Sequence, residues 1–322
     1  MSMDFSVLKH CTVVTEKDPR LDDPAFQHDT PLQLDGIRKD IMYLDEQVVP
    51  NFFLNEYMWH IPGTPVEQSE VELKAAAPHV SSYDKVISFI GTNEEDLYDI
   101  CGEVEILLEN RRFTLTRHFA VYIPAGMCHA VTVKRVDRPM WQYVLGNANR
   151  YDSTPCEIPA EGSGRDLEKL FAYRYGVGPL PEDVTKGTGP KDQFGRHDHI
   201  TRMDEDMVPD AQFYIEASWM GTAPQPPLPE GKEHAGPGTH WHPFPELINF
   251  FGADPENPYD LGSHVYLTLE DQPFDITKSF VACIPSDVPH CPLYMKKIDT
   301  RMVHFTAGPS SSYIIDKREE DK

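Results

Sequence analysis

The chain has 322 residues, of which 40% are hydrophobic, and its mean hydropathy is −0.46. No run approaches the ~18 uninterrupted apolar residues that a membrane helix needs, so an integral membrane protein is excluded. The 52 acidic residues against 29 Lys and Arg give a formal net charge of −23, which would repel nucleic-acid backbones and anionic lipid surfaces, so we expect neither as a partner.

Short strand-type runs account for most of the sequence. Residues 1–50 are predicted to form an arm in which residues 36–48 make one short helix. Strand-type runs extend from Asn51 to about Gly146 and again from about Ala211 to Ile315. Residues 147–200 between them are rich in Pro, Gly and charge and are interpreted as a connector, in which residues 164–175 have apolar side chains at helical spacing. The 29 Pro and 20 Gly disfavour long helices and indicate a β-rich fold.

The two strand-rich blocks are copies of one unit. When the second block is placed on the first at a constant offset of 161 residues, residues 79–129 pair with residues 240–290 over 51 positions without a gap, and 16 pairs are identical. Chance would supply about three identities at ordinary residue frequencies. Two unrelated β domains of similar composition would not keep a constant register, so we infer an internal duplication.

Four residues of the second copy have the types and spacing of a metal site. His240 and His242 are two residues apart, so on a strand both imidazoles project from the same face. Glu246 begins the next apolar run, and His290 follows 44 residues later (290 − 246), far enough for a returning strand to bring it back. Three imidazoles and one carboxylate suit Fe, Mn, Ni, Zn, Co or Cu, so we predict one divalent transition metal here.

An isolated His-x-His pair is weak evidence, and the chain contains a second example in the connector. His197 and His199 have the same spacing, but no strand pattern surrounds them and no Glu follows. We interpret this pair as part of a solvated loop. For the set at 240–290 the alternative is a group of surface histidines with ordinary partners, but four ligand-type residues at motif spacing favour metal binding.

These residues also carry a family resemblance. GTHWHPFPELINFFG (238–252) resembles the first motif of the cupin superfamily, in which a Gly precedes His-x-His, a Glu follows, and another Gly comes six residues later; here Gly238 lies only two residues before His240. FVACIPSDVPHC (280–291) is similar to the second motif, in which a Pro-x-Gly turn precedes the last His, except that Asp287 replaces the Gly. With the duplication, the resemblance covers most of both halves and extends to the bicupins.

The resemblance implies an all-β fold of two tandem cupin barrels (double-stranded β-helices, or jelly rolls) with a short connector helix. Residues 1–160 would hold the arm and a degenerate barrel, and residues 161–322 the connector and a metal-binding barrel. It also implies that one metal is bound by the four matched residues, His240, His242, Glu246 and His290.

The first copy lacks two of these ligands. His79 and His129 match His240 and His290, but Ser81 stands at the position of the second His and Lys85 at that of the Glu. A Lys ammonium adds a positive charge and has no lone pair to offer, so we predict no metal in the first copy. Either Lys85 pairs with a nearby acid in a packed, degenerate site, or with the two histidines it holds an anionic ligand.

Apolar residues near the predicted ligands are candidates for a substrate pocket. Phe244, Ile248 and Phe250 follow His242, and Tyr266 lies on the predicted strand 263–270. On that strand Tyr266 belongs to one face, and the residues of the other face are Val265, Leu267 and Leu269. Either face can line the pocket.

The cysteine pattern is typical of reduced thiols. The six cysteines are Cys11, Cys101, Cys128, Cys156, Cys283 and Cys291, and none forms a CxxC pair. The first residues also lack the apolar core of a secretion signal. We therefore expect free thiols and a cytoplasmic protein.

Metal chemistry is the function that these features favour. The sequence has no Gly-rich phosphate loop and no Ser nucleophile elbow. We expect a metal-dependent enzyme that acts on a small organic acid or phenolic compound by dioxygenase or by decarboxylase or lyase chemistry, with Glu246 also able to act as a base. The alternative is a non-catalytic, metal-containing protein that binds a small molecule. The arm and large sheets also suggest a homodimer.

Overall fold

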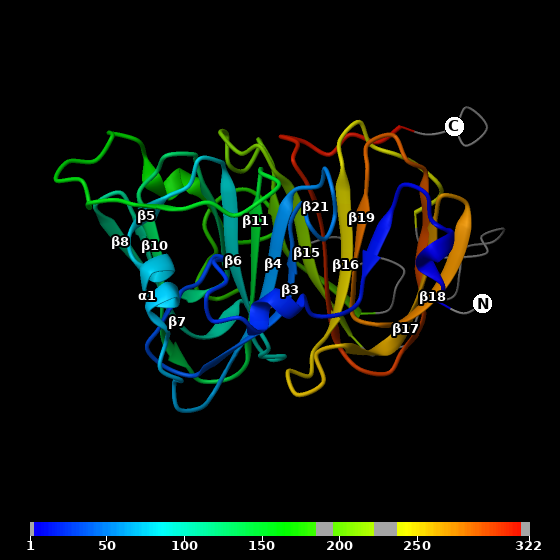
Figure 1. The fold of residues 1–322 in the computed structure, drawn as a ribbon, viewed down its shortest axis with the longest axis horizontal. Coiled ribbons are helices and arrows are strands. Elements are labelled where there is room, and N and C mark those ends of the chain that lie inside the picture. Colours follow the sequence, from blue (N-terminus) through cyan, green and yellow to red (C-terminus); the bar gives the residue numbers. More distant parts are fainter. Residues whose placement is uncertain (1–2, 185–195, 222–236, 317–322) are drawn as a thin grey trace. The chain divides into compact units, whose positions relative to one another are not determined.

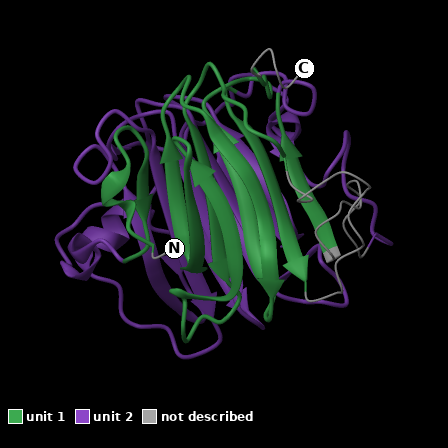
Figure 2. Ribbon diagram, turned by 90° about the vertical axis from the view of Figure 1, so that its right-hand side faces the viewer, with its two compact units in different colours: residues 1–16, 187–204, 212–322 green, residues 17–186, 205–211 purple. Residues whose placement is uncertain are grey.

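A computed structural model of the protein describes residues 3–184, 196–221 and 237–316 (Figure 1). The chain forms two compact units, which Figure 2 distinguishes by colour. The N-terminal unit comprises residues 17–186 and 205–211, and the C-terminal unit comprises residues 1–16, 187–204 and 212–322. Each unit consists mainly of antiparallel strands, so the fold is all-β as predicted.

The N-terminal unit contains two six-stranded sheets. The first has the order β13 (Phe171–Ala172), β9 (Phe119–Ile123), β6 (Lys85–Gly91), β11 (Met140–Gly146), β4 (Leu54–Ile61) and β3 (Ile37–Leu44). The second has the order β12 (Thr154–Pro155), β5 (His79–Val80), β10 (His129–Val136), β7 (Asp99–Leu108) and β8 (Arg111–Arg117), and β2 (Leu32–Gln33) pairs with β10 in parallel. The helical segments of this unit are α1 (Glu70–Ala76) and the 3-10 helices η2 (Pro19–Asp22) and η3 (Leu167–Leu170).

The C-terminal unit has one six-stranded and one three-stranded sheet. The first has the order β1 (Thr12–Val14), β19 (Phe280–Ile284), β16 (Glu246–Gly252), β21 (Met302–Gly308), β15 (Tyr214–Gly221) and β14 (Arg196–Met203). The second has the order β18 (Gln272–Lys278), β17 (Asp260–Leu269) and β20 (His290–Ile298), and the 3-10 helix η1 spans Phe5–Val7. Side chains of both sheets share one buried core, which includes Ile248 and Phe250 of β16 and Val265 and Leu267 of β17.

The duplication found in the sequence is present in the strands. β6 and β16 begin 161 residues apart (246 − 85), as do β7 and β17 (260 − 99) and β9 and β19 (280 − 119). The turn before the last histidine of each copy is also equivalent, because Gly126 and Asp287 both have positive φ, 77° and 63°. Their backbone N–H groups donate to the carbonyls of Ser81 and His242, each at 2.8 Å. Asp287 therefore adopts the left-handed conformation that Gly supplies in the other copy.

Two predictions about local structure were wrong. The predicted helix at 36–48 is mostly strand β3, which pairs with β4 from Ile37 opposite Ile61 to Leu44 opposite Asn55. This segment forms a strand because it pairs with a neighbouring strand, and the local periodicity of a sequence does not indicate such pairing. The short connector helix predicted within residues 164–175 is present as the 3-10 helix η3. The predicted arm is divided, because β1 joins the sheet of the C-terminal unit, whereas β2 and β3 belong to the N-terminal unit. The compact units thus have boundaries different from 1–160 and 161–322.

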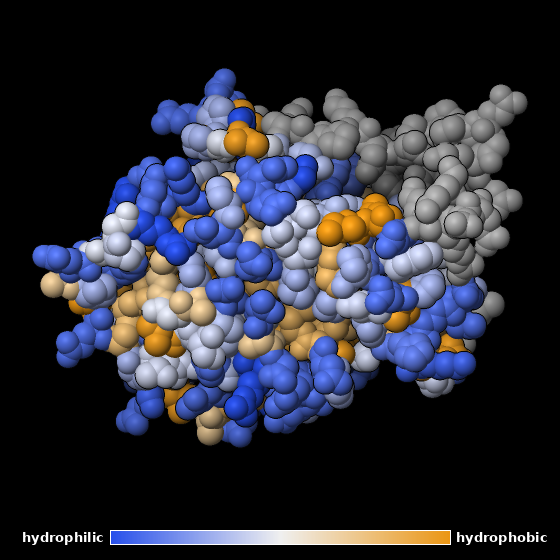
Figure 3. All heavy atoms as spheres, turned by 90° about the horizontal axis from the view of Figure 1, so that it is seen from above, coloured by the Kyte–Doolittle hydropathy of each residue, from blue (hydrophilic) through white to orange (hydrophobic). Residues whose placement is uncertain are grey.

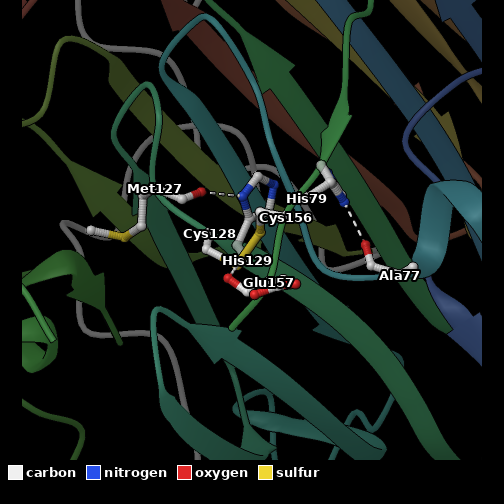
Figure 4. Close-up of a disulfide and its surroundings, with 7 residues drawn as sticks. All are labelled: Ala77, His79, Met127, Cys128, His129, Cys156 and Glu157. Atoms are coloured by element: carbon white, nitrogen blue, oxygen red, sulfur yellow. Dashed lines mark hydrogen bonds between the residues drawn. A yellow bond between two sulfur atoms is a disulfide. The ribbon is translucent and has the colours of Figure 1, made fainter. Parts of the chain in front are cut away.

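The expectation of six reduced thiols was also wrong. Cys128 and Cys156 form a disulfide beside His129 and His79 (Figure 4). The other cysteines, Cys11, Cys101, Cys283 and Cys291, are free and buried. Sequence spacing did not show the bond because the two cysteines are 28 residues apart and meet only when the segment after β11 returns along β5. A cytoplasmic location, which depended partly on reduced thiols, stays a prediction.

The exterior agrees with the composition. Figure 3 shows hydrophilic residues over most of the viewed face, with hydrophobic residues exposed in small groups among them. No helix in the described residues has the length and apolar character needed to cross a membrane.

Candidate metal centre

The four predicted ligand residues lie together in the C-terminal unit. His240 forms an isolated antiparallel bridge with His290, the first residue of β20, through backbone bonds of 3.0 and 3.1 Å. Glu246 is the first residue of β16. One ligand-type atom from each of His240, His242, Glu246 and His290 lies within 4.8 Å of the others, and all four residues are buried.

Backbone carbonyls orient the three imidazoles. His240 Nδ1 lies 2.8 Å from Gly238 O, and His290 Nδ1 lies 3.0 Å from Val288 O. His242 Nδ1 lies 2.5 Å from Ile314 O, in the segment that follows β21. A carbonyl oxygen can only accept a hydrogen bond, so each Nδ1 carries the proton and each neutral ring has its lone pair on Nε2.

These lone pairs face the carboxylate of Glu246. Its Oε2 lies 2.9 Å from His290 Nε2 and 3.3 Å from His242 Nε2. Its Oε1 accepts a hydrogen bond from Thr306 Oγ1 at 2.7 Å. Lone pairs placed this close together repel one another unless a proton or a metal ion lies between them, and three imidazole nitrogens with one carboxylate form a donor set that fits a metal ion.

The electrostatics of the centre favour an ionised Glu246 and a neutral His240, whereas at His242 burial lowers the pKa but the hydrogen bond and charge of Glu246 outweigh it and raise that pKa. Burial raises the pKa of Glu246, but the two neighbouring imidazoles, His242 and His290, outweigh it and hold this pKa well below its usual range. Burial also lowers the pKa of His240 to about 4. An ionised carboxylate and a neutral imidazole are the forms that bind a metal.

A cavity of ≈ 130 Å³ adjoins the centre. Its wall includes His240 and Glu246, the apolar residues Met220, Pro237, Ile248, Phe250, Leu293 and Met295, and the polar or sulfur-containing residues His197, Cys291, His304, Thr306 and Tyr313. Two of the predicted pocket residues, Ile248 and Phe250, line it. The predicted metal ligands His240 and Glu246 therefore form part of the wall of a largely apolar cavity.

The other two predicted pocket residues do not line this cavity. Phe244 is buried with its ring 5.0 Å from that of His242, centroid to centroid, in a stacked arrangement. Tyr266 stacks on Tyr294 at 4.5 Å. Along β17 the buried face is that of Val265, Leu267 and Leu269, so of the two faces left open by the sequence this one points into the core and Tyr266 points away from it.

The interpretation of His197 and His199 as a solvated loop was wrong. Both lie on β14, which pairs with β15, and His199 is buried. His199 Nδ1 lies 2.7 Å from Glu216 Oε1, and His197 Nε2 lies 2.7 Å from Ser218 Oγ. The Pro, Gly and charge of the surrounding connector hid this strand from the sequence analysis.

Other cavity residues were also missed by sequence reasoning. His304 and Thr306 lie two residues apart on β21, and the β-period of residues 302–308 is the signal that places them on one face. Tyr313 lies beyond the last paired strand, with its ring 4.9 Å from that of His242, and no sequence pattern indicated this contact. Cys291 also lines the cavity although it directly follows the ligand His290 on β20, and its positive φ of 71° interrupts the alternation of that strand.

In the N-terminal unit, Lys85 stands at the position of Glu246 and pairs with Asp29. The Lys85 ammonium donates to Asp29 Oδ2, and both side chains are buried. Burial raises the pKa of Asp29, but the charge of Lys85 outweighs it and lowers this pKa to about 2. Burial, together with the same ammonium, lowers the pKa of His79 and that of His129. Of the two interpretations of Lys85, the structure shows the pair with an acid.

This pair brings a positive charge to the histidine positions of the N-terminal unit. Asp29, His79 and His129 have ligand-type atoms within 4.8 Å of one another, and the Lys85 ammonium lies among them as a covalently attached cation. His79 Nδ1 and His129 Nδ1 are bonded to the carbonyls of Ala77 and Met127, as their counterparts are in the C-terminal unit (Figure 4). The histidine framework is thus kept while a side chain supplies the positive charge.

Comparisons with known proteins give a likeness in fold. No protein-family model and no curated protein matches the sequence. Among solved structures, a formate complex of Lactobacillus farciminis oxalate decarboxylase matches with a TM-score of 0.53 at 10% identity, covering 98% of this chain and 90% of that one. A Bacillus subtilis oxalate decarboxylase at pH 4.6 matches with a TM-score of 0.51 at 11% identity, covering 92% of this chain and 80% of that one. A variant of the Bacillus subtilis enzyme matches with a TM-score of 0.51 at 10% identity. The strand arrangement and these likenesses together show that the chain has an all-β fold of two tandem cupin barrels.

Proposed function

We propose that the protein is a metal-dependent enzyme that acts on a small organic acid by decarboxylase or lyase chemistry, at a single mononuclear site in the C-terminal barrel. The observation that carries this proposal is the convergence of three carbonyl-oriented imidazoles and one carboxylate beside a small, largely apolar cavity. The shared fold with oxalate decarboxylases supports the choice of reaction.

The ligands of the metal would be His240 Nε2, His242 Nε2, His290 Nε2 and Glu246. This set suits a divalent transition metal, and such an ion would polarise the carboxylate of an acid bound next to it. Both oxygens of Glu246 are engaged, one with Thr306 and one with the imidazoles. Together with its lowered pKa, this assigns Glu246 to the ligand set, and we do not assign it the role of base that the sequence allowed.

The cavity selects the size of the substrate. Its ≈ 130 Å³ is below the ~300–1,000 Å³ of pockets that hold drug-sized ligands, so it suits a short acid better than a polycyclic phenol. Ile248, Phe250 and Leu293 form part of an apolar wall, which would reduce the contact of a bound carboxylate with water and so strengthen electrostatic interactions inside the site.

The test measures metal content and two gases on one preparation. Elemental analysis of purified protein should find about one transition-metal ion per chain. Incubation with a panel of short mono- and dicarboxylates, oxalate included, should release carbon dioxide without consuming oxygen, and chelation followed by reloading should abolish and restore this activity. His242→Ala is the inactive control.

Three outcomes would contradict the proposal in different ways. Oxygen consumed in proportion to substrate would indicate the dioxygenase instead of the decarboxylase. One metal per chain with acid binding but no turnover of any acid would indicate the non-catalytic binding protein. Protein that takes up no metal would refute the site itself.

A further inference from the structure

His304 is a polar residue in the cavity wall that the metal centre does not use. It lies on β21 opposite Phe250 of β16 and Ser218 of β15. Its ring stacks on that of Phe250, with 4.1 Å between centroids and 13° between planes. Thr306, which donates to Glu246, is two residues farther along the same face of β21. Two residues of strand span ~7 Å, about the length of a short organic acid.

The backbone determines which nitrogen of His304 can accept a hydrogen bond. Nδ1 lies 2.7 Å from Asn249 O, so Nδ1 carries the proton and donates it to that carbonyl. The Nε2 lone pair is then an acceptor, and His304 is half-buried in the cavity wall. Burial lowers the pKa of His304 to about 4, which agrees with a neutral ring near pH 7.

The neighbouring polar groups already have partners. The hydroxyl of Thr306 donates to Glu246 Oε1 at 2.7 Å, and His197 Nε2 lies 2.7 Å from Ser218 Oγ. Among the described residues, by contrast, no group hydrogen-bonds to His304 Nε2. An acceptor without a protein partner in a mostly apolar wall favours a ligand that brings a donor, because a ligand that covers it without a donor would cost the free energy of its hydrogen bond to water.

We propose that His304 Nε2 accepts a hydrogen bond from a hydroxyl group of the substrate, so that the site selects hydroxylated short acids over acids of the same length without the hydroxyl. The placement of the carboxylate at the metal ligands rests on the proposed function. His304 is a specificity-determining residue in this account, and the metal ligands do not depend on it.

The experiment compares matched acids by titration calorimetry. Propionate, 2-hydroxypropionate and 3-hydroxypropionate are titrated into native protein, His304→Phe and His304→Gln. Phe keeps a ring against Phe250 but removes the acceptor, whereas Gln keeps an oxygen that can accept. His118→Phe is the matched control, because His118 also has Nδ1 bonded to a backbone carbonyl, Phe89 O at 2.8 Å, but is in the N-terminal unit. Metal content and the thermal unfolding midpoint are measured for every variant.

Native protein should bind one of the two hydroxypropionates roughly three- to tenfold more tightly than propionate, the worth of one neutral hydrogen bond. The ratio of hydroxypropionate affinity to propionate affinity should fall in His304→Phe, which lacks the acceptor, and should be partly kept in His304→Gln. In His118→Phe the ratio should equal that of the native protein. Propionate affinity and metal content should stay at native levels in all variants. The fall in the ratio is the test, since a hydroxyl can also approach a metal.

Two results would overturn the proposal. The first is that native protein binds none of these acids or binds all three equally. The second is that a folded His304→Phe variant keeps the native affinity ratio, or that a folded His304→Gln variant retains none of the preference. The titration is also run on chelator-treated protein. A preference that depends on His304 with no metal taken up would refute the proposed function alone, whereas full metal content without that preference would refute only the role of His304.

Discussion

His242 is the predicted ligand whose orientation depends on a distant part of the chain. His240 and His290 donate from Nδ1 to the carbonyl two residues before them, so their own turns hold the rings. His242 donates instead to Ile314 O, 72 residues away, and its ring lies between Phe244 and Tyr313. The sequence predicted that His242 is a ligand, but it did not indicate that Ile314 O would orient the ring.

Substitution of His242 by Ala should remove the metal. The variant loses one of four ligands and leaves a gap beside Glu246. We therefore expect metal affinity to fall by more than ~100-fold, which exceeds the loss typical when only a residue that orients a ligand is removed. Elemental analysis after dialysis checks this. His264→Ala, a change at an exposed histidine of β17, should keep native metal content. Full occupancy in His242→Ala would show that the ligand set is misassigned.

The buried pair of Asp29 and Lys85 should make the N-terminal unit sensitive to acid. The pKa of Asp29 in the folded protein, about 2, is below its ordinary value of 3.8, so the charged carboxylate stabilises the fold above about pH 4. This contribution, on the order of 2 kcal/mol, should be lost as pH falls from about 4 to about 2. Urea unfolding at several pH values measures the slope.

Asp29→Asn should flatten that slope and destabilise the protein at neutral pH, because it leaves the Lys85 charge buried without its acid. Asp137→Asn, at a largely exposed acid paired with Arg135, serves as the control and should keep the native slope. An unchanged pH dependence in Asp29→Asn would mean that the pair does not titrate as described.

Among the elements, strands were predicted well where the run is mostly apolar and both faces are buried. β16, with the buried residues Ile248 and Phe250, and β9 were evident as apolar runs between turn residues. β3 and β14 were missed, because their sequences carry polar residues whose partners come from neighbouring strands. His199 on β14, for example, is compatible with burial only because Glu216 of β15 lies beside it.

The segment after β21 should hold the metal centre in shape. It supplies Ile314 O to His242 and the ring of Tyr313, and Asp316 pairs with Trp241 through backbone bonds. A chain ending at Gly308 should therefore lose metal affinity by ~10- to 100-fold, as for other losses of an orienting partner. Competition with a chromogenic chelator measures it. A chain ending at Asp316 is the control and should bind as the full chain does; equal affinity in both truncated chains would contradict this role.

Across the whole molecule, one histidine framework occurs twice, with a carboxylate at the fourth position in one unit and an ammonium in the other. The C-terminal unit has the donor set for a metal, and in the N-terminal unit the Lys85 ammonium lies among Asp29, His79 and His129. A metal content of about one per chain, and not two, follows from this arrangement. The homodimer expected from the sequence stays a prediction, to be decided by the mass in solution.

Restoring the missing ligands should add a second metal. In Ser81→His with Lys85→Glu, the ammonium is replaced by a carboxylate next to Asp29, so the two negative charges repel unless a cation binds. We expect the metal content to rise from about one toward two per chain and the variant to gain thermal stability when metal is added. Ser82→His with Lys134→Glu, an exposed pair of changes, should leave the content at about one. A double variant at Ser81 and Lys85 that folds but takes up no second ion would show that the barrel is closed to metals.

The duplication, the all-β class and the four candidate ligands could be inferred from the sequence, because each depends on spacing along the chain. The informative spacings are a period of two on strands, the positions of turn residues, and a register that repeats after 161 residues. Tertiary structure decided the partners. Asp29 reaches Lys85, Ile314 reaches His242, Cys156 reaches Cys128 and Asn249 orients His304 only after strands far apart in sequence have paired. Hydrogen bonds, ion pairs and cavity walls depend on distances in space, and the local spacing of residues does not indicate which distant strand will supply the partner.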